Sequence, residues 1–265
     1  MIEEIRIDTV EKAMALIMDQ ERNQAIDRLR SAYFYRGMPC SEWPLVTSLS
    51  RNCKRLQAQL EPTILSNFTK YASIEDPTLS ASVWKQMIVG QHHGLPTRLL
   101  DWTHSPLIAL HFALSESDLD DLARRDAVIW RIDARDVNRN LPERYRETLG
   151  DAFVFSMDKL RRVADTLQQY DRDMAGRAFI ILEPPSLEQR IISQYSFFSV
   201  IPQDMEDIER FLAERTVRTH KYIIDKSVRW DLRDMLDQFN ISERVIYPGL
   251  DGLTKWIGRH YYVKE

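Results

Sequence analysis

Glycine and cysteine are both scarce in this chain of 265 residues, and the absences exclude several familiar sites. The 8 glycines are roughly 3% of the chain against a typical share of about 7%. No GxGxxG or GxxxxGK(S/T) sequence occurs, which excludes the dinucleotide-binding turn and the P-loop. GxSxG and HExxH are absent too, which excludes the nucleophile elbow and the helical zinc motif. Cys40 and Cys53 form neither a disulfide framework nor a CxxC pair.

Excess basic charge and long apolar runs are also missing. Lys+Arg is 36 and Asp+Glu is 40, a net charge of −4, whereas non-specific nucleic-acid binders usually carry a basic domain. The basic dipeptides Arg124-Arg125 and Arg161-Arg162 are expected to be solvated surface. No apolar stretch reaches membrane-spanning length, and acidic residues interrupt the first twenty positions. We therefore expect a cytoplasmic protein without a membrane partner.

Apolar periodicity predicts an α+β fold with a mixed or antiparallel sheet flanked by helices. Asp8 and Glu11 have capping-box spacing, and Ser105-Pro106 is a strong helix start. We expect an N-terminal helical segment over residues 1–30 and one compact unit over 31–265. Helices are expected over about 8–29, 61–72, 80–93, 106–114, 157–174, 228–239 and 250–261, and a loop over 38–53. Strands are expected over 32–37, 127–132, 179–182, 188–194, 197–201 and 217–224, with 95–103 extended.

The segment Gln91–His111 concentrates polar chemistry, with four of the six histidines, Arg98, Asp101 and Trp102. A metal site needs three or four converging ligands, and the histidine spacing does not predict one. Each histidine can equally be a half-buried packing residue. Arg98 and Asp101 can alternatively form an ion pair with each other that stabilises a turn. We expect no metal.

Two further segments place polar residues on strands. Arg36 ends an aromatic strand, where its donors suit a phosphate or carboxylate, and Gly37 beside it would let a ligand approach the backbone. Residues 188–194, taken as a strand, would put Glu188 and Gln194 on one face. In the structural alternatives, Arg36 only covers an aromatic face at the end of its strand, and residues 188–194 form an edge strand that faces solvent.

These segments together resemble a known family. The resemblance is to the FRG-domain family of bacteria and their mobile elements, named after a Phe-Arg-Gly type motif. It is carried by Phe34-Tyr35-Arg36-Gly37, by the block from Gln91 to Ala113, by Arg190, Gln194 and Phe197, and by Leu250-Asp251-Gly252-Leu253. It implies a toxin or phage-defence effector, with a protein antidote or a second copy of the chain as partner.

The pattern is also distantly similar to ADP-ribosyltransferases, which implies a split sheet and NAD as substrate. In that similarity Arg36 ends the first strand, Thr103 precedes a helix, and Glu188 lies on a later strand. This chain departs from the pattern because no paired glutamate motif is present, and Gln194 holds the matching place.

The similarity implies a division of roles. The expected catalytic residues are Arg36, Thr103, Glu188 and Gln194, and the expected NAD-binding residues are Tyr35, Arg36, His93, Arg98, Asp101 and Trp102. Glu188 would stabilise an oxocarbenium-like ribose, Arg36 would bind the diphosphate, and Trp102 or a tyrosine would stack on a ring. The expected function is that of an NAD-dependent ADP-ribosyltransferase that modifies a macromolecular acceptor, or of an NAD hydrolase, for which water is the acceptor. A non-catalytic module on the same fold, binding a ligand, nucleic acid or protein, is the alternative, and a metal-dependent hydrolase is a third hypothesis.

Overall fold

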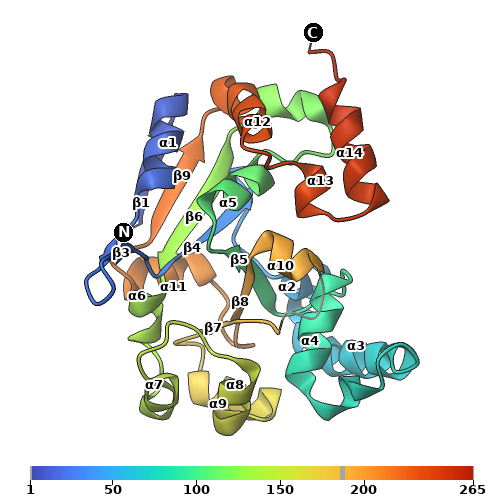
Figure 1. Ribbon diagram of the computed structural model, residues 1–265. Helices are drawn as coiled ribbons and strands as arrows, with labels where there is room; N and C mark the ends of the chain where they lie inside the picture. The colour runs from blue at the N-terminus through green and yellow to red at the C-terminus, as the bar shows by residue number, and fades with distance from the viewer. Residues whose placement is uncertain (1, 186–188, 265) are drawn as a thin grey trace.

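The computed structural model describes residues 2–185 and 189–264. Its centre is a seven-stranded mixed sheet with helices on both faces, as the sequence predicted (Figure 1). The outer pair, β1 and β9, is parallel, and the other pairs in this sheet are antiparallel. In spatial order the strands are β1 (Glu3–Ile7), β9 (His220–Ile224), β6 (Ala127–Asp133), β4 (Tyr33–Met38), β5 (Leu99–Thr103), β8 (Ser196–Val200) and β7 (Ile180–Leu182).

The sheet opens between two of its central strands. β4 pairs with β6 along its whole length, from Tyr33 to Met38, and β5 pairs with β8 from Leu99 to Thr103. Between β4 and β5, by contrast, only Tyr35 and Thr103 pair. The remaining backbone of these two neighbours is therefore not joined across the gap, and polar side chains can enter it.

The segments that connect the strands differ in length, and they contain the helices that surround the sheet. A small hairpin of β2 (Arg22–Asn23) and β3 (Arg28–Leu29) also follows the first helix. The α-helices are α1 (Val10–Met18), α2 (Ser48–Cys53), α3 (Gln57–Ala72), α4 (Val83–His92), α5 (Pro106–Ala113), α6 (Ala134–Asn138), α7 (Glu143–Leu149), α8 (Met157–Val163), α9 (Leu167–Met174), α10 (Gln189–Gln194), α11 (Ile208–Arg215), α12 (Arg229–Gln238), α13 (Glu243–Ile246) and α14 (Leu250–His260). The 3₁₀ turns are η1 (Lys54–Leu56), η2 (Pro77–Ala81), η3 (Leu119–Ala123) and η4 (Lys226–Val228).

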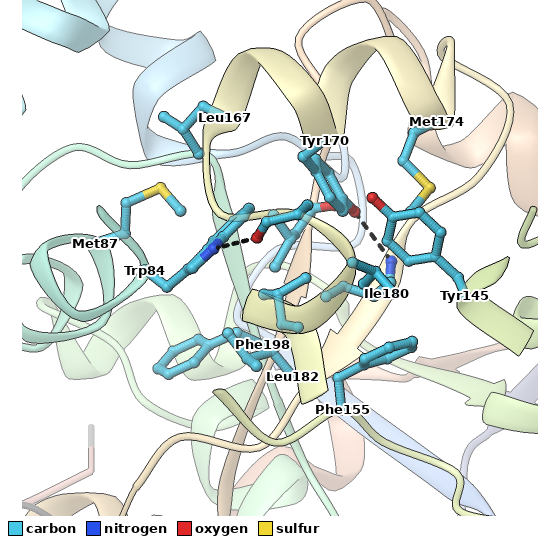
Figure 2. Packing of buried hydrophobic residues seen from close by; sticks show 14 of the residues in the cluster. Trp84, Met87, Tyr145, Phe155, Leu167, Tyr170, Met174, Ile180, Leu182 and Phe198 are labelled. Atoms are coloured by element: carbon cyan, nitrogen blue, oxygen red, sulfur yellow. Dashed lines mark hydrogen bonds between the residues drawn. The ribbon is translucent and has the colours of Figure 1, made fainter. Parts of the chain in front are cut away.

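Three apolar clusters hold these layers together. One face of the sheet packs against α1, α5 and α12, and the other packs against α6 and α11. The third cluster joins β7 and β8 to α4 and to the lobe of α7, α8 and α9. In it, the Tyr170 hydroxyl donates to Val200 O at 2.7 Å. The same hydroxyl accepts from Ile180 N at 3.1 Å (Figure 2). The Trp84 indole donates to Ala164 O at 2.9 Å, so the polar atoms of these two buried aromatic side chains are paired.

Several predicted elements are wrong in extent or type. The N-terminal helix ends at Met18, and its cap is Thr9 rather than Asp8. Residues 188–194 were predicted as a strand, but Gln189–Gln194 form α10. Over so few residues, an alternating pattern does not distinguish the period of a strand from that of a helix. The predicted loop over 38–53 contains α2.

Within the described residues, no helix combines the length and apolar character that crossing a bilayer requires.

Candidate functional site

A pocket of about 250 Å³ lies where β4 and β5 separate. Six residues of the predicted set contribute to its wall, although they come from three distant parts of the sequence. We call it the Arg36 pocket. Its described lining residues are Tyr35, Arg36, Gly37, Gln91, Asp101, Trp102, Thr103, Phe112, Gln194 and Ser196.

Arg36 is an incompletely paired cation in this pocket. Its Nη1 donates to the carbonyl oxygen of Asp101 at 2.8 Å and lies 3.5 Å from Asp101 Oδ2. Its Nε is buried without a hydrogen-bond partner. Burial lowers the pKa of Arg36, but a guanidinium stays protonated in proteins. The side chain is 22% exposed, so a charged donor group remains available to an anion that enters the pocket.

Asp101 is held from its other side by a chain of hydrogen bonds. Gln91 Nε2 donates to Asp101 Oδ2 at 3.0 Å. The Thr97 hydroxyl donates to Gln91 Oε1 at 2.7 Å, and Leu99 N donates to Thr97 Oγ1 at 3.1 Å. These contacts orient the Gln91 amide and direct the Asp101 carboxylate. Sequence reasoning missed Gln91 as a site residue, although it begins the block that carries the family resemblance.

Thr103 and the start of α5 form the next part of the wall. Thr103 Oγ1 accepts a hydrogen bond from Ser105 N at 3.1 Å. Ser105 in turn caps α5 by accepting from Ile108 N at 3.3 Å, and Pro106 takes the first helical position. The helix start predicted from Ser105-Pro106 is confirmed, and it fixes where the Thr103 side chain lies.

Gly37 is required by the packing of α5 against β4. A Cβ at this position would lie 1.8 Å from Ala109 O and 2.6 Å from Ala113 N. The sequence analysis attributed this glycine to the approach of a ligand. It does line the pocket, but the contact that demands a glycine is the one with the helix backbone.

The two aromatic side chains predicted to contact a ligand are engaged elsewhere. Tyr35 is fully buried, its hydroxyl accepts from Gln20 Nε2 at 3.2 Å, and burial raises its pKa to about 12. The Trp102 ring is buried and its Nε1 donates to Ser199 Oγ at 2.9 Å. Neither ring is free to stack on a ligand as the sequence analysis expected. Phe112 of α5, which that analysis did not select, is the half-buried aromatic in the lining.

Gln194 reaches the pocket from the end of α10. Its Nε2 contacts Ile246 O at 3.4 Å, which links the pocket wall to α13. Tyr195 follows with a φ of 50°, a left-handed conformation, and turns the chain into β8 at Ser196. Glu188, the predicted catalytic glutamate, lies outside the described residues.

Arg98 and His93 do not belong to the described lining of the Arg36 pocket. Arg98 is buried and pairs with Glu61, with Nε to Oε1 at 2.7 Å, and with Asp171 at 2.5 Å. The alternative ion pair between Arg98 and Asp101 is therefore not formed. His93 is exposed at the end of α4.

The histidines of Gln91–His111 do not converge. His104 Nδ1 lies 3.0 Å from Tyr33 O, and its ring packs on Phe34, with centroids 4.1 Å apart. His111 Nδ1 accepts from Arg233 Nη1 at 2.9 Å, and burial lowers the pKa of His111 to about 3. Among the described residues, no group of three or more His, Cys, Asp or Glu side chains is arranged to hold a metal ion.

Comparison with known proteins identifies one domain. Residues 31–121 match the family model of the FRG domain. This segment runs from just before β4 to η3, and it supplies the pocket wall except for Gln194 and Ser196. No curated protein and no solved structure matches the chain.

Proposed function

We propose that the FRG domain of this chain binds NAD in the Arg36 pocket, and that the protein is an ADP-ribosyltransferase-like enzyme or NAD hydrolase. One observation carries the proposal. Arg36, Thr103 and Gln194, to which the distant similarity to ADP-ribosyltransferases assigns catalytic roles, line the same pocket although they lie far apart in sequence. That convergence is what a site built around one ligand requires.

Arg36 supports an anionic ligand. Its guanidinium bonds a neutral carbonyl oxygen at 2.8 Å, and the nearest carboxylate oxygen of Asp101 is 3.5 Å away. A diphosphate would supply charge-assisted acceptors to the part of the guanidinium that stays exposed. The pocket volume of about 250 Å³ is smaller than the roughly 300–1,000 Å³ of sites that enclose a drug-sized ligand. Part of the dinucleotide would therefore extend beyond the mouth.

The reaction would break the bond between the ribose C1′ and the nicotinamide nitrogen. The electron pair leaves on nicotinamide, and positive charge develops on the ribose. The Asp101 carboxylate, oriented by Gln91, would stabilise that charge electrostatically, and Gln194 would contact the ribose. Thr103 would orient the nicotinamide. Water or an acceptor group then bonds C1′ and gives up a proton. That Glu188 stabilises the positive charge on the ribose remains a prediction from the sequence.

A binding module without catalysis is the second candidate. Asp101 is the one carboxylate among the described lining residues, and it already accepts from Gln91 and lies near Arg36. A site that lacks a second carboxylate can bind a nucleotide without cleaving it. The family resemblance adds a toxin or phage-defence role, a macromolecular acceptor, and an antidote or second copy of the chain to either candidate.

Nicotinamide release from NAD separates the two candidates. Arg36→Gln removes the charge and keeps a polar side chain, and Asp101→Asn keeps an acceptor for Gln91. Loss of one charge-assisted contact of about 2 kcal/mol predicts release slowed about 30-fold or more by Arg36→Gln. Asp101→Asn should slow release while NAD still binds. Arg22→Gln, on the exposed β2 hairpin, is the matched control. Binding without release in the unmodified protein would favour the module.

A further inference from the structure

The surface next to the Arg36 pocket carries unpaired positive charge. Arg51, Lys54 and Arg55 are exposed on α2 and η1, and none of them forms an ion pair within the part of the chain that the structure describes. From Trp43 to Leu60 the sequence contains no Asp or Glu. We call Arg51, Lys54 and Arg55 the basic rim.

The basic rim differs from the basic dipeptides that the sequence analysis considered. Arg124 lies within 4 Å of three aspartates, and Arg125 pairs with Glu116 and Asp121. Arg161 pairs with Asp165 across one helical turn. Of the four dipeptide charges, those of Arg124, Arg125 and Arg161 are locally compensated, whereas none of the three charges of the rim is.

Hydrogen bonds tie the rim to the pocket. At the start of α2, Leu49 N donates to Thr97 O at 3.0 Å, and Thr97 N donates to Ser48 Oγ at 3.1 Å. Thr97 also orients Gln91, which lines the pocket. The charge of Arg51 is close enough to contribute, after burial, to the lowered pKa of Arg36. The start of α2, which precedes the basic rim, and the pocket wall are therefore joined through Thr97.

Two further features of this region are typical of a binding surface. Lys54 has a φ of 50° and a ψ of −132°, a strained backbone for a residue other than glycine, and such strain clusters at functional sites. Tyr195 lies between the lining residues Gln194 and Ser196, and it is 60% exposed with a left-handed backbone. Exposed cations and an exposed aromatic ring at the border of one pocket are a combination that binds single-stranded nucleic acid, because bases stack on the ring while cations contact phosphates.

We propose that the basic rim binds the phosphate backbone of a single-stranded nucleic acid, and that this strand is the acceptor for the chemistry of the Arg36 pocket. The second half of this inference rests on the proposed function. In that step the C1′–nicotinamide bond of NAD breaks, with its electron pair going to nicotinamide. A nitrogen or oxygen of the strand then bonds C1′, and its proton passes to solvent. An acidic protein would also suit the basic rim, but it gives no reason for the exposed ring of Tyr195.

Fluorescence anisotropy with labelled RNA and DNA strands of about 12 nucleotides tests binding without NAD. With three phosphate contacts, affinity should fall about 20-fold between about 50 and about 200 mM salt. Arg51→Glu/Arg55→Glu should weaken binding about tenfold or more and flatten the salt dependence. Arg146→Glu/Arg162→Glu makes the same charge change on α7 and α8 and should leave affinity within about twofold.

Two milder variants keep the test decisive if the double reversal fails to fold. Arg51→Gln/Arg55→Gln should also weaken strand binding, and Tyr195→Leu should weaken it about fivefold or more through lost stacking. Absence of binding to either strand, or equal losses in the rim variant and its control, would overturn the proposal. Binding of a polyglutamate peptide in place of either strand would assign the rim to an acidic protein instead. Because nicotinamide release is measured without nucleic acid, failure of the rim and failure of the NAD proposal are distinguishable.

Discussion

Replacing Gly37 by alanine tests how the pocket is built, because one methyl group would meet helix backbone. The added Cβ would lie 1.8 Å from Ala109 O and 2.6 Å from Ala113 N. Backbone atoms cannot rotate away as a side-chain tip can, so α5 would have to move away from β4 by on the order of 1.5 Å. Overpacking of this kind costs about 3 kcal/mol or more. For a chain of this size that lowers Tm by roughly 6–12 °C.

Gly258→Ala is the matched control for that substitution. Gly258 lies inside α14, is exposed, and would place its Cβ with nothing within 4 Å. The same chemical change should there stabilise the protein by about 0.5–1 kcal/mol, because alanine loses less backbone entropy in a helix. Differential scanning calorimetry of both variants should show shifts of opposite sign. Equal shifts, or a Gly37→Ala protein as stable as the original, would refute the packing argument.

Three other substitutions test the interior. Glu61→Gln leaves the buried Arg98 with less compensating charge and should cost about 3–5 kcal/mol of unfolding free energy, measured by urea titration. Tyr170→Phe removes a hydroxyl that joins a backbone carbonyl and amide and should cost about 2–3 kcal/mol in the same assay; a cost near zero would contradict that pairing. Burial lowers the pKa of His111 to about 3 in the folded protein, below the ordinary histidine value of about 6.5, so the unfolded chain takes up a proton first as the pH falls. Stability should therefore fall by up to about 1.4 kcal/mol per pH unit as the pH drops from about 6 to about 4, and His111→Gln should reduce that slope.

Short sequence patterns correctly predicted those strands and helix starts that depend on neighbouring residues alone. The aromatic and β-branched runs of β4 and β6 gave strands at the expected places, and Ser105-Pro106 gave the start of α5. β1 was missed because Glu3–Ile7 is mostly polar and exposed. It is a strand through its pairing with β9, more than two hundred positions away, and sequence periodicity does not report such a partner.

The sequence predicted which residues line the candidate site better than it predicted what each side chain does there. Arg36, Asp101 and Thr103 do share a pocket, but the orientation of each side chain depends on which face of its strand is covered. Trp102 illustrates the limit, since its ring is buried and its Nε1 donates to Ser199 Oγ. Gln91 was not selected from the sequence, because its role in orienting Asp101 depends on contacts with Asp101 and Thr97 that form only in the folded chain.

The most direct test of the central claim is a calorimetric titration of NAD into the protein and into Arg36→Gln. We predict saturable binding to the unmodified chain, weakened about 30-fold or more by the substitution while both proteins remain folded at the temperature of the titration. Binding of equal strength to both proteins would place NAD elsewhere. Absence of binding to the unmodified, folded protein would contradict the claim that the Arg36 pocket is an NAD site.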